Sequence, residues 1–454
     1  MCVPTTPSSE VCDGIDNDCD GVIDGPTASI ACGPQSACIR ARCSPRLRWS
    51  HGLPGSGGTA FFDVAIGDHD SLLASGQLAT ADLGHGTFSS RGGIDWLVMS
   101  FDASGAIQWS YTPGGPMMDY AGSVDARDGQ VVVAGAFGGS VDFGGTTLTA
   151  PAGHTGNAVV ALDALTGATR WVYQVPYEFG VGAMIATNGD VVLTSQVRGV
   201  VNVGGVSYGI TGGVSYLVSV LNSSGTPRWT RALGAAATTR QPQVAVELAD
   251  SNMAVFALAL DAGPVDFGDG SPIAGGGLGV AVLDTTDGHL VRAVRLPIST
   301  STQVERIGVT RNAYCLSGFQ DQADFGTASG HAGFVACLDR ATLALRRASS
   351  WTEFRMWATS SDDDNVYLVG GNNSTIPTAF GSVTIGGTAM FIAQIDADSG
   401  QPVWTRSLGG SGTVPSMAAA ARAGVLSVVG SSEGSADWGS GSQPPPLEVG
   451  QFDL

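Results

Sequence analysis

Short apolar runs alternate with turn-forming residues along almost the whole chain after residue 45. In one representative stretch, apolar runs at 130–135, 158–162 and 169–173 are separated by segments rich in Gly, Asp, Ser and Thr. Runs of four to seven residues with many β-branched side chains, bounded in this way, predict strands joined by hairpins. No segment has the apolar spacing of an amphipathic helix. The pattern therefore predicts an all-β protein.

A single unit recurs seven times along the chain. Each copy contains an apolar residue followed by Asp or Asn, at intervals of 55 to 62 residues. The seven pairs are Phe101-Asp102, Leu162-Asp163, Leu221-Asn222, Leu283-Asp284, Leu338-Asp339, Ile395-Asp396 and Phe452-Asp453. A turn of the type Asp-aromatic-Gly, as at residues 142–144, precedes the pair, and we expect its Asp to cap the turn. Four predicted strands per unit at this period are typical of a β-propeller blade.

A tryptophan follows most of these pairs by seven or eight residues, as at Trp109, Trp171, Trp229 and Trp404. The fourth and fifth units lack it. Residues near Val291 and Leu345 stand at the tryptophan position there. We expect the outer strands of these two units to be the least regular.

The two ends of the chain complement each other. The last unit stops shortly after Phe452 without its fourth strand, whereas an additional copy of that strand occurs at residues 47–51. We therefore predict that a strand at about 46–51 pairs with the C-terminal blade and closes a seven-bladed propeller over residues 46–454. Closure is favourable because an open ring leaves unpaired strand edges.

The first 45 residues form a cysteine-rich segment of different composition. Six of the eight cysteines lie there: Cys2, Cys12, Cys19, Cys32, Cys38 and Cys43. A dense, even set of this kind indicates about three disulfides, but six cysteines allow 15 pairings and the sequence selects none. Because Cys12 and Cys19 flank an acidic loop, a bridge between them would fix the loop.

The acidic loop predicts a calcium site. Asp16, Asp18 and Asp20 alternate and are followed by Gly21, as in loops of the EF-hand type. The predicted ligands are Asp16, Asp18, Asp20, the Val22 carbonyl, Asp24 and Asp13. Thr27 stands where such loops carry a bidentate Glu, so another oxygen, from Asp13 or Glu10, has to complete the shell. The alternative is an acidic, disulfide-bonded turn without metal.

Two resemblances to known families follow from these motifs. Residues 2–25 resemble the MopE-type metal-binding motif of exported proteins of myxobacteria and their relatives, with Gly25 where that family usually has Glu. The later units resemble the β-propeller repeats of bacterial surface and secreted proteins, best at residues 93–109. Together the resemblances imply an exported or cell-surface protein and carry no catalytic residues.

Residues 162–171 resemble the tryptophan-docking repeat of quinoprotein dehydrogenases. In that family the repeat locks neighbouring blades together and does not bind the quinone. The adjacent cysteine pair common in those enzymes is absent here. We therefore do not expect a quinone enzyme.

The charge and composition of the chain limit the classes of binding partner and of chemistry. With a net charge of −19, the protein repels nucleic acid and anionic membrane surfaces. All 21 basic residues are arginine, which excludes chemistry that requires lysine. No apolar run is long enough for a transmembrane segment, and the sequence has no recognisable signal peptide. The cysteine content nevertheless favours secretion or a cell-surface location.

Three further groups of residues have simple expected roles. Cys315 and Cys337 fall in consecutive predicted strands and are either bridged or buried as free thiols. Residues 362–365 are expected to form a hairpin turn. The six histidines are scattered along the chain, without metal-ligand spacing.

The sequence favours a non-enzymatic, calcium-stabilised extracellular binding or scaffold protein. Its ligand, a protein or a carbohydrate, would bind at a propeller face or in the central channel. One alternative is a cell-surface structural component that self-associates. Another is a hydrolase or lyase with its site in the channel, because the propeller fold alone does not decide function.

Overall fold

The protein is described here by a computed structural model. The described residues are 7–25, 27–32, 38–39, 42–43, 45–56, 58–176, 179–203, 205–236, 244–250, 252–260, 267, 277–298, 302–322, 324–325, 332–362, 365–372, 374, 376–380, 383–386, 389–410, 416–431, 436–438, 442–443 and 446–454.

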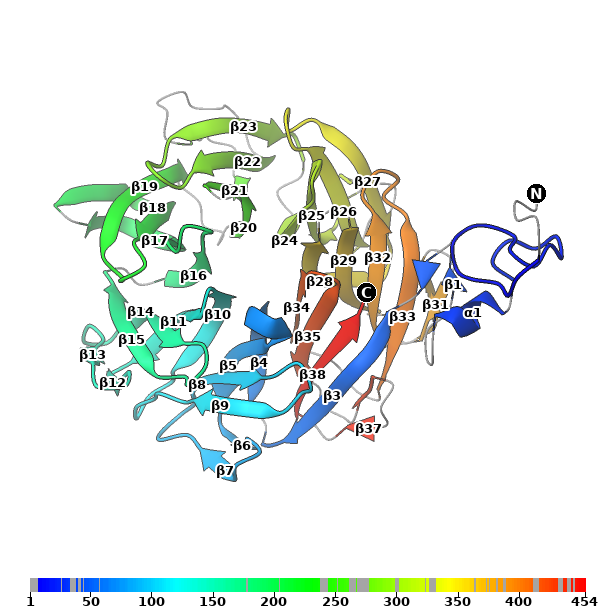
Figure 1. The fold of residues 1–454 in the computed structure, drawn as a ribbon. Helices are drawn as coiled ribbons and strands as arrows, with labels where there is room; N and C mark the ends of the chain where they lie inside the picture. The colour runs from blue at the N-terminus through cyan, green and yellow to red at the C-terminus, as the bar shows by residue number, and fades with distance from the viewer. Residues whose placement is uncertain are drawn as a thin grey trace.

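Seven antiparallel sheets of four main strands are arranged in a ring around a central axis (Figure 1). Each sheet is one blade, named here from its innermost strand outward. Blade 1 contains β4 (Ala60–Ile66), β5 (Leu72–Leu78), β8 (Asp95–Phe101) and β9 (Ile107–Tyr111). Blade 2 contains β10 (Tyr120–Arg127), β11 (Gln130–Gly138), β14 (Thr155–Asp163) and β15 (Thr169–Val175). Blade 3 contains β16 (Phe179–Ile185), β17 (Val191–Val203), β18 (Val206–Leu221) and β19 (Pro227–Ala236).

The remaining blades follow the same order. Blade 4 contains β20 (Val244–Asp250), β21 (Met253–Leu260), β22 (Gly277–Asp284) and β23 (Leu290–Leu296). Blade 5 contains β24 (Gln303–Val309), β25 (Ala313–Gln320), β26 (Ala332–Asp339) and β27 (Leu345–Trp351). Blade 6 contains β28 (Phe354–Asp362), β29 (Asn365–Asn372), β32 (Met390–Asp396) and β33 (Pro402–Gly410). The closing blade contains β34 (Ser416–Arg422), β35 (Val425–Ser431), β38 (Pro446–Asp453) and β3 (Arg46–Pro54).

The closing blade confirms the predicted pairing of the two chain ends. Strand β3 is its outermost strand and runs antiparallel to β38, with Leu47 opposite Phe452 and Trp49 opposite Gln451. The predicted hairpin at residues 362–365 is also present, since Asp362 pairs with Asn365, although residues 363 and 364 lie outside the described residues.

Small hairpins follow the second main strand of several blades and carry the Asp-aromatic-Gly turn. They are β6 (Thr80–Asp82) with β7 (Thr87–Ser89), β12 (Ser140–Asp142) with β13 (Thr147–Thr149), β30 (Thr378–Phe380) with β31 (Val383–Ile385), and β36 (Ala436–Asp437) with β37 (Ser442–Gln443). The central residue of the turn is buried at Leu83, Phe143, Phe267, Phe325, Phe380 and Trp438. The Asp caps its turn as predicted in blades 1 and 2, because Asp82 accepts the Gly84 N–H at 3.0 Å and Asp142 accepts the Gly145 N–H.

Tryptophans of the outer strands connect neighbouring blades. The indole Nε1–H of Trp109 in blade 1 donates to the Ala164 carbonyl of blade 2 at 3.0 Å, and its ring covers Gly167 so closely that a Cβ there would clash. The same bond joins Trp49 to Ala103, Trp171 to Ser223 and Trp229 to Thr285. The turn that begins at the Asp or Asn of each recurring pair thus accepts the tryptophan of the preceding blade.

Arginine takes over this role at the next two junctions. By register, Arg292 and Arg347 stand at the tryptophan position, one residue after Val291 and two residues after Leu345. Arg292 donates to the carbonyls of Arg340 and Ala341, and Arg347 Nε donates to the Asp398 carbonyl at 3.0 Å. The expected irregularity is also absent, because β23 and β27 each pair through six residues with one bulge, as β15 does.

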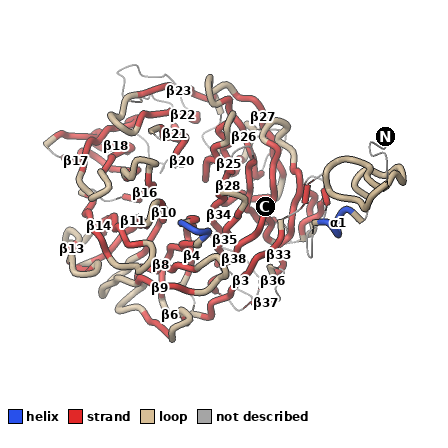
Figure 2. Tube along the Cα trace, in the orientation of Figure 1, coloured by secondary structure: helices blue, strands red, loops and turns tan. Residues whose placement is uncertain are grey.

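The cysteine-rich segment projects beyond the outer edge of the ring near β33 (Figure 1). It contains α1 (Ala28–Ala31), β1 (Cys38–Ile39) and β2 (Arg42–Cys43). Figure 2 shows helix only in α1 and in the 3-10 turn η1 (Asp68–Asp70), among the residues described. Within the same ranges, none of the helices has the length and apolar character needed to cross a bilayer.

Candidate functional site

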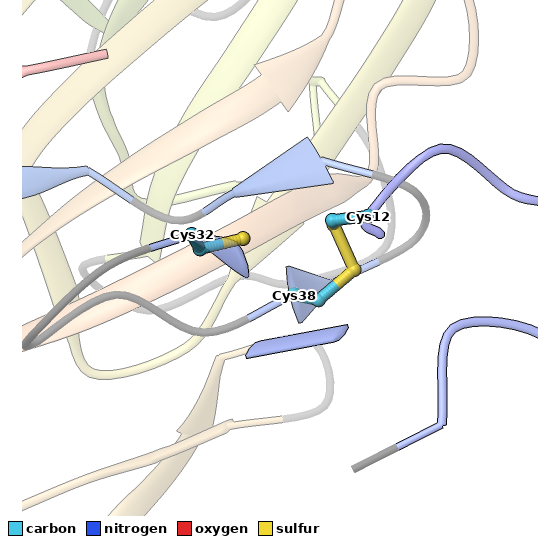
Figure 3. A group of neighbouring side chains, drawn as sticks. All are labelled: Cys12, Cys32 and Cys38. Atoms are coloured by element: carbon cyan, nitrogen blue, oxygen red, sulfur yellow. A yellow bond between two sulfur atoms is a disulfide. The ribbon is translucent and has the colours of Figure 1, made fainter. Parts of the chain in front are cut away.

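The projecting segment, residues 7–43 of the described chain and called the arm below, is cross-linked internally. A disulfide joins Cys12, at the start of the acidic loop, to Cys38 in β1 (Figure 3). This pairing excludes a Cys12–Cys19 bridge, which the sequence had left as one of the possible pairings. Cys19 and Cys32 are also disulfide-bonded, and Cys2 lies outside the described residues. The sulfurs of Cys12, Cys32 and Cys38 lie close together, but all three are disulfide-bonded and are not available as metal ligands.

Three carboxylates of the arm converge. Glu10, Asp16 and Asp18 each place an oxygen within 4.8 Å of the others. Glu10 and Asp16 are 3% and 4% exposed, which is unusual for acidic side chains in so small a segment. Glu10 is held in place because its Oε1 accepts the N–H groups of Asn17 at 2.7 Å and Asp18 at 2.9 Å.

Asp16 leaves one oxygen without a partner. Its Oδ2 accepts the Gly21 N–H at 3.3 Å, whereas its Oδ1 is buried and has no hydrogen bond. A buried carboxylate oxygen without a donor is costly, and the cost rises beside two further carboxylates. A cation between these groups would remove both penalties, so the residues fit a metal site with hard oxygen ligands.

The remaining predicted ligands serve local backbone contacts. Asp24 Oδ1 accepts the N–H groups of Asp13 and Gly14, both at 3.0 Å. Asp13 Oδ1 accepts the Ile15 N–H at 3.0 Å, and Asp20 Oδ1 accepts the Val22 N–H at 2.8 Å. Asp13 Oδ2 also accepts from the Asn17 side-chain amide at 3.4 Å. Metal coordination by Asp13, Asp20, Asp24 and the Val22 carbonyl therefore stays a prediction.

The electrostatics of the cluster agree with this geometry. Desolvation, together with the charges of Asp20, Glu10 and Asp16, raises the pKa of Asp18 against the opposing effect of the Asp20 N–H. Burial and the neighbouring negative charges therefore disfavour the ionised form of Asp18.

A second polar group lies in the channel, on the innermost strands. Asp63 in β4 accepts the Val124 N–H of blade 2 at 3.1 Å, and Asp125 in β10 accepts the Ile185 N–H of blade 3 at 2.6 Å. Burial raises the pKa of Asp63, and it raises the pKa of Asp125 to about 6. These carboxylates join successive blades at the inner rim.

Arg306 extends into the same region from the far side of the ring. Its Nη2 lies 3.8 Å from Asp63 Oδ1, so an ion pair joins blade 5 to blade 1, which are not neighbours in the ring. Neither Asp63, Asp125 nor Arg306 was predicted. A β-bulge precedes both Asp63 and Arg306 and changes which side of the strand their side chains occupy. The apolar and polar pattern of the sequence does not reveal the position of such a bulge.

An apolar surface lies beside this group on the loop between β9 and β10. Met117 and Met118 are more than half exposed, and Tyr120 is 39% exposed with Phe62 packed edge-on at 6.3 Å. The loop rests on residues 91–95, since the Gly93 N–H donates to the Met117 carbonyl and Arg91 donates to the Thr112 carbonyl. We call Met117, Met118, Tyr120 and Arg91 the rim patch.

One further group could bind a metal by distance alone. Asp284, Asp287 and His289 converge on the turn that receives Trp229. Asp287 and His289 are exposed and hydrogen-bonded to each other at 2.8 Å, so they have no unsatisfied buried atom. This turn is explained without a ligand.

Comparisons with known proteins reveal a fold likeness. No family model and no curated protein matches the sequence. BamB from Moraxella catarrhalis is 13% identical, with 90% of this chain and 98% of that chain covered and a TM-score of 0.40. Quinohemoprotein alcohol dehydrogenase from Comamonas testosteroni is 10% identical, with 90% and 76% covered and a TM-score of 0.44. The enzyme ADHIIG from Pseudomonas putida HK5 is 11% identical, with the same coverage and a TM-score of 0.40. These resemblances carry no inference about ligand or activity.

Proposed function

We propose that this chain is an exported, non-enzymatic scaffold protein that binds Ca²⁺ in its N-terminal arm and a protein or carbohydrate ligand on its propeller. The observation that carries the calcium part is the orphaned Oδ1 of Asp16, buried beside Glu10 and Asp18. Carboxylate oxygens in a flexible loop are the ligands that Ca²⁺ prefers.

Glu10, Asp16 and Asp18 would hold the ion, and Asp13, Asp20, Asp24 and the Val22 carbonyl are the further ligands we propose. The role of Ca²⁺ would be structural, because it neutralises buried charge in a segment with little apolar core. Glu10 fits the missing acidic ligand at the Thr27 position, which supports the resemblance to the MopE-type motif.

The division into an arm (residues 1–45) and a propeller (residues 46–454) follows from the same reasoning. The propeller supplies a rigid ring, and its channel rim is the surface on which we place ligand binding. Two disulfides, Cys12–Cys38 and Cys315–Cys337, support an exported location because such bonds persist in oxidising compartments.

Calcium titration calorimetry of the full chain tests the proposal. We expect one site, and we expect Asp16→Asn to weaken binding by at least about tenfold because it removes the orphaned charge. The matched control is Asp287→Asn on the exposed turn of blade 4, which should bind as the unchanged protein does. No binding, or equal binding by Asp16→Asn, would refute the calcium site.

A hydrolase or lyase is the second candidate, favoured by one observation. Burial, with a smaller contribution from the charge of Asp63, raises the pKa of Asp125 to about 6, and a carboxyl with such a pKa suits a general acid. Their backbone hydrogen bonds to the next blades provide a structural explanation, so we rank the enzyme second. A loss of turnover on a glycoside or ester panel in Asp125→Asn, with the fold intact, would reverse the ranking.

A further inference from the structure

Two adjacent methionines of the loop between β9 and β10 stand out among the methionines of the chain. Met117 and Met118 are 55% and 63% exposed. The other methionines whose side chains the structure describes are buried or partly buried: Met99, Met184, Met253, Met356 and Met390. Because thioethers are oxidised where solvent reaches them, Met117 and Met118 are the ones that an oxidant in solution meets first.

The nearest backbone leaves these two side chains uncovered. A Cβ on Gly138 or on Gly139 would lie 3.5 or 3.6 Å from Met117 Sδ, and a Cβ on Gly93 would lie 3.1 Å from Met118 Cγ. Since these three neighbours are glycines, none of them has a side chain that could shield the methionines. A small polar oxidant such as hydrogen peroxide can therefore approach both thioethers while the protein stays folded.

The loop itself is held by bonds that do not involve either sulfur. The Asp119 N–H donates to the Ile94 carbonyl at 2.7 Å. The fully buried Asp119 carboxylate accepts the N–H groups of Gly115 and Gly138, both at 2.7 Å. A chemical change at the methionine sulfurs leaves these bonds in place. Oxidation should therefore alter the surface of the loop without releasing it from blades 1 and 2.

We propose that Met117 and Met118 form an oxidation site for peroxides, at which sulfoxide formation changes the rim patch from an apolar to a polar surface. In each reaction the sulfur lone pair attacks one peroxide oxygen and the O–O bond breaks. The other oxygen leaves as water with both hydrogens, so the sulfur loses two electrons and the peroxide gains them. The reaction itself needs neither calcium nor a ligand, and only its effect on ligand binding at the rim rests on the proposed function.

Peroxide treatment of the full chain, followed by tryptic peptide mapping, tests the oxidation site. A single tryptic peptide, residues 92–127, contains both loop methionines and the buried Met99. We expect the loop methionines to be oxidised at least about tenfold faster than Met99, because Met99 becomes accessible only when the fold opens. Equal rates within this peptide, or faster oxidation of any other methionine, would overturn the proposal.

Hydrophobic-interaction chromatography measures the change at the surface. The oxidised protein should elute earlier than the untreated protein. The variant Met117→Leu with Met118→Leu keeps the apolar area without an oxidisable sulfur, so peroxide should leave its elution unchanged. The matched control Met184→Leu with Met253→Leu keeps both loop methionines and should shift as the unchanged protein does. An equal shift in the loop variant would show that the surface changes elsewhere and would refute the proposal.

Two measurements on the oxidised protein separate this proposal from its alternatives. Its urea denaturation midpoint should equal that of the untreated protein, because the bonds that hold the loop remain, and a lower midpoint would contradict a change confined to the surface. Its calcium binding should also be unchanged, since residues 7–43 contain no methionine. Absent calcium binding with normal oxidation of the loop refutes the proposed function alone, and normal calcium binding without selective oxidation refutes this inference alone.

Discussion

The junctions between blades are closed by two kinds of chemistry. From the closing blade to blade 4, a tryptophan ring lies over a glycine and donates one hydrogen bond, as Trp109 does over Gly167. From blade 4 to blade 6, an arginine makes the hydrogen bonds instead, as Arg292 does to Ala341 at 2.7 Å. The same backbone turn therefore accepts either a buried apolar ring or a charged donor.

The receiving turn explains the exchange at Arg292. Leu343 occupies the place of Gly167, in the same left-handed conformation with φ of 59°, and its side chain is buried. The leucine fills the volume that an indole ring covers elsewhere. An indole ring therefore has no room at this junction. The Arg292 side chain instead reaches the carbonyls of the next blade along the surface and donates hydrogen bonds to them.

Blade 5 lies between the two arginine junctions and contains the Cys315–Cys337 disulfide. The bond joins β25 to β26, where the two cysteines are direct partners with a Cα–Cα distance of 4.0 Å. Of the two options left open by the sequence, the bridged one is present. The blade with the most polar junctions is thus the one with a covalent link.

The largest expected effect comes from a tryptophan junction. Trp109→Ala removes a buried ring and its hydrogen bond and should lower the free energy of unfolding by about 3–5 kcal/mol. Arg292→Met removes only partly exposed donors and should cost about 1–2 kcal/mol. Urea denaturation of both variants measures the difference, and equal costs would remove the distinction between the two kinds of junction.

The next largest effect concerns the covalent link in blade 5. Replacing both Cys315 and Cys337 by Ala opens a loop with a sequence separation of 22 residues and should cost about 2–4 kcal/mol. Hydrogen exchange should then show the added opening in β25 and β26 rather than in blades 1 to 3. Exchange that increases evenly around the ring would contradict a local role.

A smaller effect tests the exchange of Leu343 for glycine. Arg292→Trp alone should be destabilising because Leu343 occupies the space of the ring. Adding Leu343→Gly should recover about 1–2 kcal/mol relative to the sum of the two single changes. Additive single and double variants, measured by urea denaturation, would show that the two positions are independent.

The smallest expected effect is a pH dependence of stability that comes from the innermost strands and not from the outer junctions between blades. The pKa of Asp125 is raised to about 6 in the fold, so the ionised form is disfavoured and stability should fall as the pH rises from about 4 to about 6. Asp125→Asn should remove a change on the order of 1–2 kcal/mol from this window. The contacts of Arg292 do not titrate there, so Arg292→Met should keep the pH dependence of the unchanged protein.

The sequence was sufficient for the ring but not for its junctions. The seven apolar-Asp pairs and the strand around Trp49 predicted the blades and their closure, because each depends on local pattern and on repetition. The sequence placed the residue at this junction only near Val291, so the role of Arg292 was not predicted. Only the register of β22 with β23 shows that it, rather than Val291, faces the next blade.

The carboxylate cluster of the arm was predicted in its residue type and in part in its members. The alternating aspartates of the loop indicated oxygen ligands, and two of them, Asp16 and Asp18, do converge. Glu10 comes from outside the loop and was one of two candidates, with Asp13, for the remaining oxygen; the sequence did not choose between them because the choice depends on how the chain folds back. The channel residue Asp125 was missed for a similar reason, since its partner Ile185 belongs to another blade.

The most direct test of the account is a crystal structure of the full chain grown with Ca²⁺, with anomalous diffraction measured at a wavelength sensitive to calcium. We predict one strong anomalous peak in the arm, in contact with carboxylate oxygens of Glu10, Asp16 and Asp18. An arm without such a peak, or with Asp16 Oδ1 satisfied by a protein donor instead of an ion, would contradict the account.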